Sequence, residues 1–343
     1  MYEPLSAAII PLIEWYRSEH ADYPWRTSPT PYHVWISEIM LQQTRIEAVL
    51  PYYARFLSVL PDIESLAAVE DDVLMKLWQG LGYYSRARNL KKAAILLCRD
   101  HGGRLPESAE ELQKLPGIGA YTAGAISSIA YGQGEPAVDG NVLRVCMRLL
   151  ACRDDITLPA VKKTLTEKLR EVYPTGREAG LLTQAWMELG EKICIPNGTP
   201  DCLCCPLSEI CRGCALGIAD ELPVHGEKKP RRIEARTVFL LVCDGKYAIQ
   251  KRPSSGLLAN LWEFPNCEGN LTLDEAATRF TRASDCRALG RAKHIFTHVE
   301  WHMVGFSLSL PEPSSEYQWA TAGEIAEKYA IPTAFRFYAG QMK

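Results

Sequence analysis

The spacing of apolar residues divides the chain into two parts. From Pro4 to about Leu222, apolar positions recur at intervals of three and four, as they do in amphipathic helices. No strand-like alternation of apolar and polar residues occurs before about residue 235. Beyond it, short apolar runs bounded by turn residues predict strands. We therefore expect an all-α region followed by an α+β region.

The boundaries of these regions follow from composition. Residues 1–222 form the expected all-α catalytic region, 223–235 a polar, charged and proline-broken linker, and 236–343 the α+β domain. Helices of the first region are expected over 4–20, 31–44, 50–59, 63–69, 73–78, 89–99, 109–115 and 142–150. In the second, we expect a β-hairpin (238–242 and 247–249, with an Asp-Gly turn), helices over 274–282 and 323–329, and strands over 293–298 and 302–310.

Composition excludes some functions. The chain has 343 residues, enough for two or three domains, and no apolar run of membrane-spanning length. Its net charge of −3 counts mildly against a strongly electrostatic nucleic-acid binder, although a local cationic face remains compatible with DNA. Because the start of the chain lacks a basic, signal-like segment, we expect a cytoplasmic protein without a membrane partner. Twelve cysteines in that compartment favour a metal site over disulfides.

A glycine-rich turn is the first candidate for chemistry. Gly117 and Gly119 flank one isoleucine directly before small, helix-forming residues. Such a turn directs backbone N–H groups and a helix N-terminus outward, which suits a phosphate. The plain alternative is a loop between two packed helices. Asp139, one helix later, precedes a further helix and is a candidate for an N-cap, for a functional carboxylate, or for both.

Glu38 is the second candidate. Within 31–44 it is surrounded by Ile36, Ile39, Met40 and Leu41. A carboxyl group in apolar surroundings has a raised pKa and can serve as a general acid. The residues alone favour equally a glutamate on the solvent-facing side of an amphipathic helix.

Several motifs resemble those of one family. Residues 115–123 resemble the helix-hairpin-helix element of DNA-repair glycosylases, and 138–142 resembles the segment that carries their active-site aspartate. Residues 37–44 (SEIMLQQT) and 80–89 (GLGYYSRARN) resemble the adenine-DNA glycosylase (MutY) family. The resemblance implies that this is an iron-sulfur DNA-repair enzyme with an all-α helix-hairpin-helix glycosylase domain, its hairpin at about 109–130.

The resemblance also implies roles for individual residues. Glu38 is implied as the catalytic acid and Asp139 as the stabiliser of the sugar cation, in a site ordered by Tyr121 and Asn141. The implied contacts with the adenine and the duplex come from Gln43 as a wedge, Tyr83 as an intercalator and Gln184 as a reader of adenine. From the residues themselves, Gly117, Gly119 and Arg26 are candidates for contacts with phosphates. For Tyr83, packing at a helix end is the alternative.

Four cysteines form a candidate metal site. Cys194, Cys202, Cys205 and Cys211 have the spacing C-x7-C-x2-C-x5-C, which suits a [4Fe-4S] cluster. The family's first gap is usually one residue shorter. In a rival grouping, Cys202, Cys205, Cys211 and Cys214 form two C-x2-C pairs that suit zinc, but it leaves Cys194 unused. We favour the iron-sulfur cluster, in a loop over 194–211.

The C-terminal part resembles the second domain of the same glycosylases, a Nudix-like fold. Residues 256–265 carry this resemblance, while the glutamate-rich box of a pyrophosphate hydrolase is missing. Phe296, Thr297 and His298 match the family's 8-oxoguanine-recognition loop, usually Phe-Ser-His, and Thr297 keeps the hydroxyl group. Without the resemblance, a strand edge with a solvated histidine is favoured.

These observations predict a function. We expect a DNA glycosylase that hydrolyses the N-glycosidic bond of adenine paired with 8-oxoguanine or guanine in double-stranded DNA, acting as a monomer and associated with the nucleoid. Related strand-cutting enzymes have a Schiff-base lysine where this chain has Tyr121, so little or no lyase activity is expected. A glycosylase for oxidised pyrimidines and a non-catalytic iron-sulfur lesion sensor are the alternatives.

Overall fold

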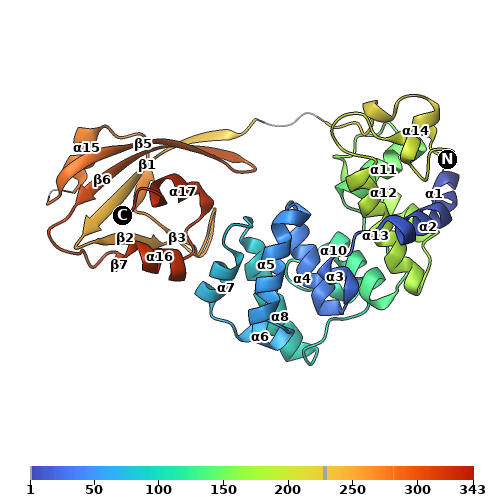
Figure 1. Ribbon diagram of the computed structural model, residues 1–343, viewed down its shortest axis with the longest axis horizontal. Helices are drawn as coiled ribbons and strands as arrows, with labels where there is room; N and C mark the ends of the chain where they lie inside the picture. Colours follow the sequence, from blue (N-terminus) through green and yellow to red (C-terminus); the bar gives the residue numbers. More distant parts are fainter. Residues whose placement is uncertain (1, 227–229, 281) are drawn as a thin grey trace. The chain divides into compact units, whose positions relative to one another are not determined.

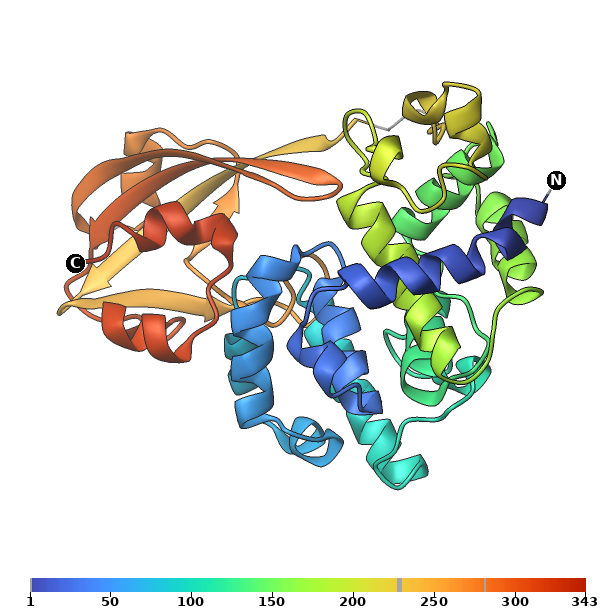
Figure 2. The same ribbon diagram turned by 45° about the vertical axis from the view of Figure 1, so that its right-hand side comes forward.

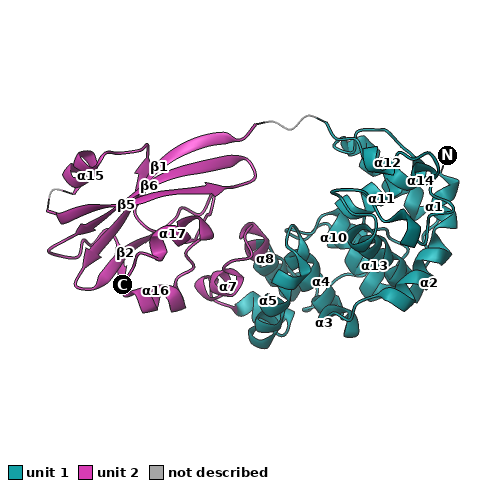
Figure 3. Cartoon of the chain, turned by 45° about the horizontal axis from the view of Figure 1, so that its top comes forward, with its two compact units in different colours: residues 1–68, 89–227 teal, residues 69–88, 228–343 magenta. Residues whose placement is uncertain are grey.

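The computed structural model describes residues 2–226, 230–280 and 282–343. It divides into two compact units (Figure 3). Residues 1–68 and 89–227 form one, here called the helical unit, and residues 69–88 and 228–343 form the other, here called the sheet unit. None of the described helices combines the length and the apolar character that a membrane span requires.

Most helices of the structure belong to the helical unit, and Figure 1 labels many of them. Its α-helices are α1 (Glu3–Ala7), α2 (Ile9–Glu19), α3 (Pro24–Thr27), α4 (Pro31–Leu41), α5 (Ile46–Val59), α6 (Ile63–Ala68), most of α8 (Ser85–Asp100), α9 (Ala109–Leu112), α10 (Ala120–Ala125), α11 (Gly140–Leu150), α12 (Pro159–Arg170), α13 (Arg177–Lys192) and α14 (Arg212–Ala215). α10 continues directly into a π-helical turn, η1 (Ile126–Ala130).

Local sequence explains where the two most important helices begin. At α4, the Thr30 side chain accepts a hydrogen bond from the His33 amide, and Pro31 occupies the first helical turn. At α11, the Asp139 side chain accepts a hydrogen bond from the Val142 amide. Each cap satisfies an N–H group that the helix itself leaves without a partner.

The core of the helical unit lies between α2, α11 and α13. Buried side chains such as Leu12, Leu149 and Trp186 pack together there. In Figure 2 the blue α2 lies across the yellow-green α13. This packing fixes α11 and α13 relative to each other, and both helices contribute side chains to the same cavity.

The turn between α9 and α10 requires glycine at one position. Gly117 has a φ of +79°, and a Cβ atom there would lie 2.6 Å from Asn89 Cβ. A side chain at this position would therefore be strained and would collide with α8. Gly119 follows as the N-cap residue of α10.

The sheet unit is built on a seven-stranded mixed sheet. Its main path runs β3-β2-β1-β6-β5, with β4 paired to β1, β7 paired to β2, and β1 and β6 parallel. The strands are β1 (Arg232–Cys243), β2 (Lys246–Lys251), β3 (Trp262–Glu263), β4 (Asn266–Glu268), β5 (Ser284–Ile295), β6 (Val299–Ser309) and β7 (Gln318–Ala320). The helices are α7 (Asp71–Trp78), α15 (Leu273–Arg279), α16 (Ala322–Lys328) and α17 (Arg336–Ala339).

β1 is buried on both faces. Val238 and Leu240 belong to one apolar core, with Phe335 and Tyr338, whereas Phe239 and Leu241 belong to a second core, with Phe280 beside it. Since successive side chains of a strand point to opposite faces, a strand covered on both sides has a continuous apolar run.

α7 joins the sheet unit through polar contacts as well as packing. Lys76 Nζ donates to the Tyr329 carbonyl at 3.3 Å, and Gln79 Nε2 donates to the Ile331 carbonyl at 2.9 Å. Further along, the Tyr83 hydroxyl lies 3.0 Å from the Thr297 hydroxyl. The segment after α7 therefore meets the loop between β5 and β6 within one compact unit.

The predicted elements agree with the structure in part. The predicted β-hairpin is confirmed, with Val242 opposite Tyr247. The single helix expected over 4–20 is wrong, because it is interrupted at Ala8 between α1 and α2. The analysis did not predict α12 or the short β3, β4 and β7. β1 begins at Arg232, inside the range 223–235 expected as linker, of which 227–229 lie outside the described residues.

Candidate active site

One cavity in the helical unit brings together the four residues expected to act in catalysis and three of those expected to contact DNA. It has a volume of about 500 Å³. Its lining includes Glu38 of α4, Tyr121 of α10, Asp139 and Asn141 at the start of α11, and Gln184 of α13. Arg26 and Gln43 also line it. A space of this size is within the usual range of small-molecule sites.

Glu38 is a buried carboxyl group that, among the described residues, has one hydrogen-bond partner. Its exposed fraction is 6 %. The Tyr121 hydroxyl donates a hydrogen bond to Glu38 Oε2 at 2.5 Å. Burial raises the pKa of Glu38 to about 7, while the Tyr121 hydrogen bond and Arg26 oppose this shift and the negative charge of Asp139 adds to it. Glu38 therefore retains its proton in a large share of molecules near neutral pH.

Asp139 is held by the helix that it caps. Its Oδ1 accepts from the Val142 amide at 2.8 Å, and its Oδ2 accepts from Asn141 Nδ2 at 3.1 Å. Burial raises the pKa of Asp139, whereas the hydrogen bonds from Val142 and Asn141 and the positive charge of Arg144 lower it. Capping and cavity lining are thus combined in one residue, and its carboxylate has a fixed orientation.

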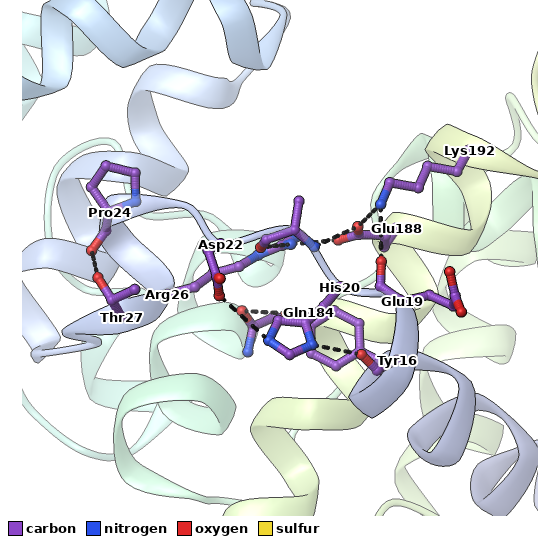
Figure 4. A network of polar contacts seen from close by, with 11 residues as sticks. Tyr16, Glu19, His20, Asp22, Pro24, Arg26, Thr27, Gln184, Glu188 and Lys192 are labelled. Carbon is purple, nitrogen blue, oxygen red and sulfur yellow. Dashed lines mark hydrogen bonds and ion pairs between the residues drawn. The ribbon is translucent and has the colours of Figure 1, made fainter.

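An ion pair that the sequence analysis missed forms one wall of the cavity (Figure 4). Arg26 Nη1 lies 2.5 Å from Oε2 of Glu188, whose side chain is 2 % exposed. On the same wall, the Tyr16 hydroxyl donates to Gln184 Oε1 at 3.1 Å. The one indication in the sequence was a charged residue, Glu188, among the apolar positions of α13.

The other expected contact residues lie away from this wall. Gln43 is exposed at the cavity edge with a φ of +57°. Gly117 and Gly119 form the turn before α10 and do not line the cavity. Tyr83 is 48 % exposed.

The loop between β5 and β6 presents its three motif residues differently. Thr297 and His298 are exposed. The Phe296 ring is half-buried, with its centroid 4.9 Å from that of the Trp301 ring. Only the first of the three residues is therefore packed into the sheet unit.

The cysteine loop gathers five thiols. Cys205 interacts electrostatically with Cys194, Cys202 and Cys211, and Cys214 lies beside Cys202. All the cysteines are free thiols, and no three described His, Cys, Asp or Glu side chains are placed as ligands of a single metal ion. The structure thus brings together the four thiols predicted for a cluster, with Cys214 next to them.

Two buried arginines of α11 connect this loop to the cavity. Arg148 Nη1 donates to Cys194 Sγ at 3.3 Å. Arg144 donates through Nε to the Cys194 carbonyl at 2.9 Å and through Nη2 to Asn141 Oδ1 at 3.0 Å. The sequence analysis singled out neither residue, because an arginine on a helix is usually solvated.

Comparison with known proteins matches both units. The profile described as "HhH-GPD superfamily base excision DNA repair protein" matches residues 36–171, and a NUDIX domain profile matches residues 237–339. Among solved structures, a thermostable thymine-DNA glycosylase superposes with a TM-score of 0.55 at 26 % identity, covering 62 % of this chain and 98 % of that one. A non-covalent endonuclease III–DNA complex gives 0.54 at 25 % identity, covering 64 % and 98 %.

The helical fold and its cavity, together with these matches, define a base-excision DNA glycosylase of the helix-hairpin-helix superfamily, followed by a Nudix-like domain. The adenine DNA glycosylase of Homo sapiens is 33 % identical over 96 % of this chain and 73 % of its own length. That of Buchnera aphidicola (subsp. Baizongia pistaciae) is 32 % identical over 84 % and 82 %. The chain belongs to the adenine DNA glycosylase family, so it is a hydrolase that removes adenine from DNA.

The Tyr121–Glu38 hydrogen bond leads to the first prediction. In Tyr121→Phe, the carboxylate form of Glu38 loses its donor, so the pKa of Glu38 should rise from about 7 by about one unit. The carboxyl infrared band of the protein, followed against pH, measures this shift. Tyr131→Phe is the control, because the Tyr131 hydroxyl donates to the Leu105 carbonyl instead. An unchanged or lowered pKa in Tyr121→Phe contradicts the assignment.

Proposed function

We propose that this adenine DNA glycosylase excises adenine paired with 8-oxoguanine or guanine in double-stranded DNA, with Glu38 as general acid and Asp139 as the anionic stabiliser. One observation carries the proposal: the two carboxyl groups line the same cavity although a hundred residues separate them in the chain. The lesion preference is supported by the Phe296–Thr297–His298 motif.

In the proposed reaction, the adenine nucleotide leaves the duplex and enters the cavity. Glu38 donates its proton to N7 of the base. This protonation makes adenine a better leaving group. The bond between N9 and C1′ then breaks, and its electron pair stays with the base, which leaves as neutral adenine. The raised pKa of Glu38 supports this role, because the proton is still present near neutral pH.

Asp139 serves the sugar in this proposal. When the base departs, positive charge develops at C1′, and the capped carboxylate stabilises it or bonds transiently to it until water completes the hydrolysis. Tyr121 orients Glu38 through its hydrogen bond, and Asn141 orients Asp139. The two carboxyl groups thus act on opposite ends of the breaking bond.

The remaining contacts are assigned to recognition. Gln184 and Arg26 line the cavity and are proposed to meet the extruded nucleoside, while Gln43 at the cavity edge enters the duplex as a wedge. Backbone N–H groups of the Gly117–Gly119 turn bind a phosphate of the DNA backbone. We propose that the enzyme acts as a monomer on the nucleoid.

Replacing the acid provides the central test. Glu38→Gln should lower the single-turnover rate of adenine release from an adenine:8-oxoguanine duplex by about 10²- to 10⁴-fold, while DNA binding persists. In the unaltered enzyme, the rate should fall as pH rises through about 7, because only protonated Glu38 donates. Free adenine is quantified directly, and Glu14→Gln, at an exposed position of α2, is the control.

The same assay separates the alternatives. A lesion sensor binds the duplex and releases no adenine even without substitution. Since a tyrosine cannot form a Schiff base, borohydride should trap little or no enzyme on the DNA. Strong trapping, or release of an oxidised pyrimidine in preference to adenine, contradicts the proposal.

Recognition of 8-oxoguanine is assigned to the pair formed by Tyr83 and Thr297. Oxidation gives the purine an N7–H donor and a C8 carbonyl, and a hydroxyl group can pair with either. The Thr297 hydroxyl is exposed and 3.0 Å from the Tyr83 hydroxyl, so a stacking ring and a hydrogen-bonding group are adjacent in the sheet unit. Phe296 and His298 complete the loop.

A substitution at Thr297 tests this assignment. Thr297→Ala should reduce the preference for adenine:8-oxoguanine over adenine:guanine by up to about tenfold, the loss expected for one hydrogen bond. The measurement is the ratio of single-turnover rates on the two duplexes. Thr278→Ala is the control, since that hydroxyl bonds within α15. Equal slowing on both duplexes contradicts a role in discrimination.

We further propose that Cys194, Cys202, Cys205 and Cys211 hold a [4Fe-4S] cluster. The free thiols gathered in this loop fit such a group, which takes one thiolate per iron, and the Arg148 guanidinium beside Cys194 Sγ favours a ligand that carries negative charge. When bound, the cluster holds the loop in place. Cys204 and Cys214 are not ligands in this assignment.

Two serine variants distinguish the cluster from zinc. Purified protein should contain about four iron and four sulfide per chain, with the broad visible absorption of such clusters. Cys194→Ser should lose or destabilise it, and Cys214→Ser should retain it. Bound zinc instead of iron, or loss of metal only in Cys214→Ser, favours the rival set of Cys202, Cys205, Cys211 and Cys214.

A further inference from the structure

Glu188 is a buried carboxylate on the wall of the catalytic cavity, and the proposed reaction does not use it. Its side chain is 2 % exposed, and α13 places it on the cavity lining. Its Oε2 lies 2.5 Å from Arg26 Nη1, and its Oε1 lies 2.5 Å from Lys192 Nζ (Figure 4). A carboxylate this deeply buried is costly to keep unless cations compensate it.

Arg26 is held in place from several sides. Besides Glu188, its Nη1 donates to the Ala21 carbonyl at 3.0 Å. Its guanidinium lies 4.8 Å from the ring centroid of Tyr23 and 5.4 Å from that of Tyr16. With a side chain only 12 % exposed, Arg26 is a fixed positive charge that solvent screens weakly.

This charge acts on the proposed acid. Arg26 lowers the pKa of Glu38, against the larger effect of burial. Other titratable or charged groups also surround the cavity: Tyr121 of α10, Asp139 of α11, Glu191 of α13 and Arg45 at the N-cap of α5. Of the charged groups on the cavity lining, Glu188 is the one that forms an ion pair with Arg26 in the described part of the chain.

We propose that Glu188 is a positioning residue for adenine excision: it fixes the Arg26 guanidinium on the cavity wall and compensates the positive charge that this group directs at Glu38. The inference rests on the proposed role of Glu38 as acid. Glu188 does not touch the base in this account. It keeps the acid protonated over the pH range in which the enzyme works.

Opposite charge changes test the proposal. In Glu188→Gln, Arg26 loses its counter-charge and stabilises the Glu38 carboxylate, so the alkaline fall of the single-turnover rate should move to lower pH by about one unit. In Arg26→Met, the fall should move to higher pH. In the double variant it should return close to its original position.

A matched control separates electrostatics from loss of structure. Glu263→Gln breaks another buried carboxylate–arginine pair, with Arg252 in the sheet unit, and should leave the pH of the fall unchanged. If Glu188→Gln folds poorly, the shift in the pH at which the rate of Arg26→Met falls still tests the proposal. An unmoved profile in both single variants, shifts in the same direction, or an equal shift in Glu263→Gln overturns the inference.

Measuring Glu38→Gln in the same experiment distinguishes failure of the proposed acid from failure of the proposed role of Glu188. If Glu38→Gln retains full activity with the same fall in rate, the proposed acid is wrong. If it loses activity while Glu188→Gln leaves the pH profile in place, only the role of Glu188 is wrong.

Discussion

Burial of the Glu38 carboxyl group is the condition on which the site depends. In water, this group would be ionised at neutral pH and unable to donate a proton. Surrounded by apolar side chains of α4 and closed off by α10, α11 and α13, it has a pKa of about 7. The same closure brings the Tyr121 hydroxyl into hydrogen-bonding contact with it and places Asp139 on the lining of the same cavity. The packing of the helical unit therefore serves a chemical purpose, because loosening it would admit water and ionise the acid.

The two carboxyl groups of the cavity are controlled by different means. Burial raises the pKa of both groups, but within the described residues Glu38 accepts one hydrogen bond, from Tyr121, whereas Asp139 caps α11 and accepts two, from Val142 and Asn141. A helix N-terminus favours negative charge, and an apolar pocket favours a proton. The chain thus folds different local environments around two chemically similar side chains, as the proposed roles of acid and anion require. Asn141 is in turn connected to the cysteine loop, because Arg144 donates hydrogen bonds both to Asn141 and to the Cys194 carbonyl.

The residues that could be predicted from the sequence are those whose local pattern carries information. The two-part fold, the hairpin that opens the sheet unit and the shared cavity of Glu38, Tyr121 and Asp139 were all expected. The sequence alone left open whether Glu38 faces solvent, because its burial depends on helices distant in the chain. The Arg26–Glu188 pair was missed for the same reason, since its partners meet only after α3 and α13 have packed. The strands β3, β4 and β7, of two or three residues, are too short to show a pattern.

The backbones of Gln43 and Tyr83 are in the left-handed region, with φ of +57° and +47°. Residues other than glycine adopt this backbone conformation at a free-energy cost of about 1 kcal/mol or more each. This cost is part of the free energy of folding and is therefore already included before DNA binds. Gln43, the proposed wedge, and Tyr83, the proposed intercalator, are therefore preorganised. Less of the binding free energy is then needed to order their backbones when a base pair opens. Their tolerance to evolutionary change should accordingly depend as much on backbone conformation as on side-chain chemistry.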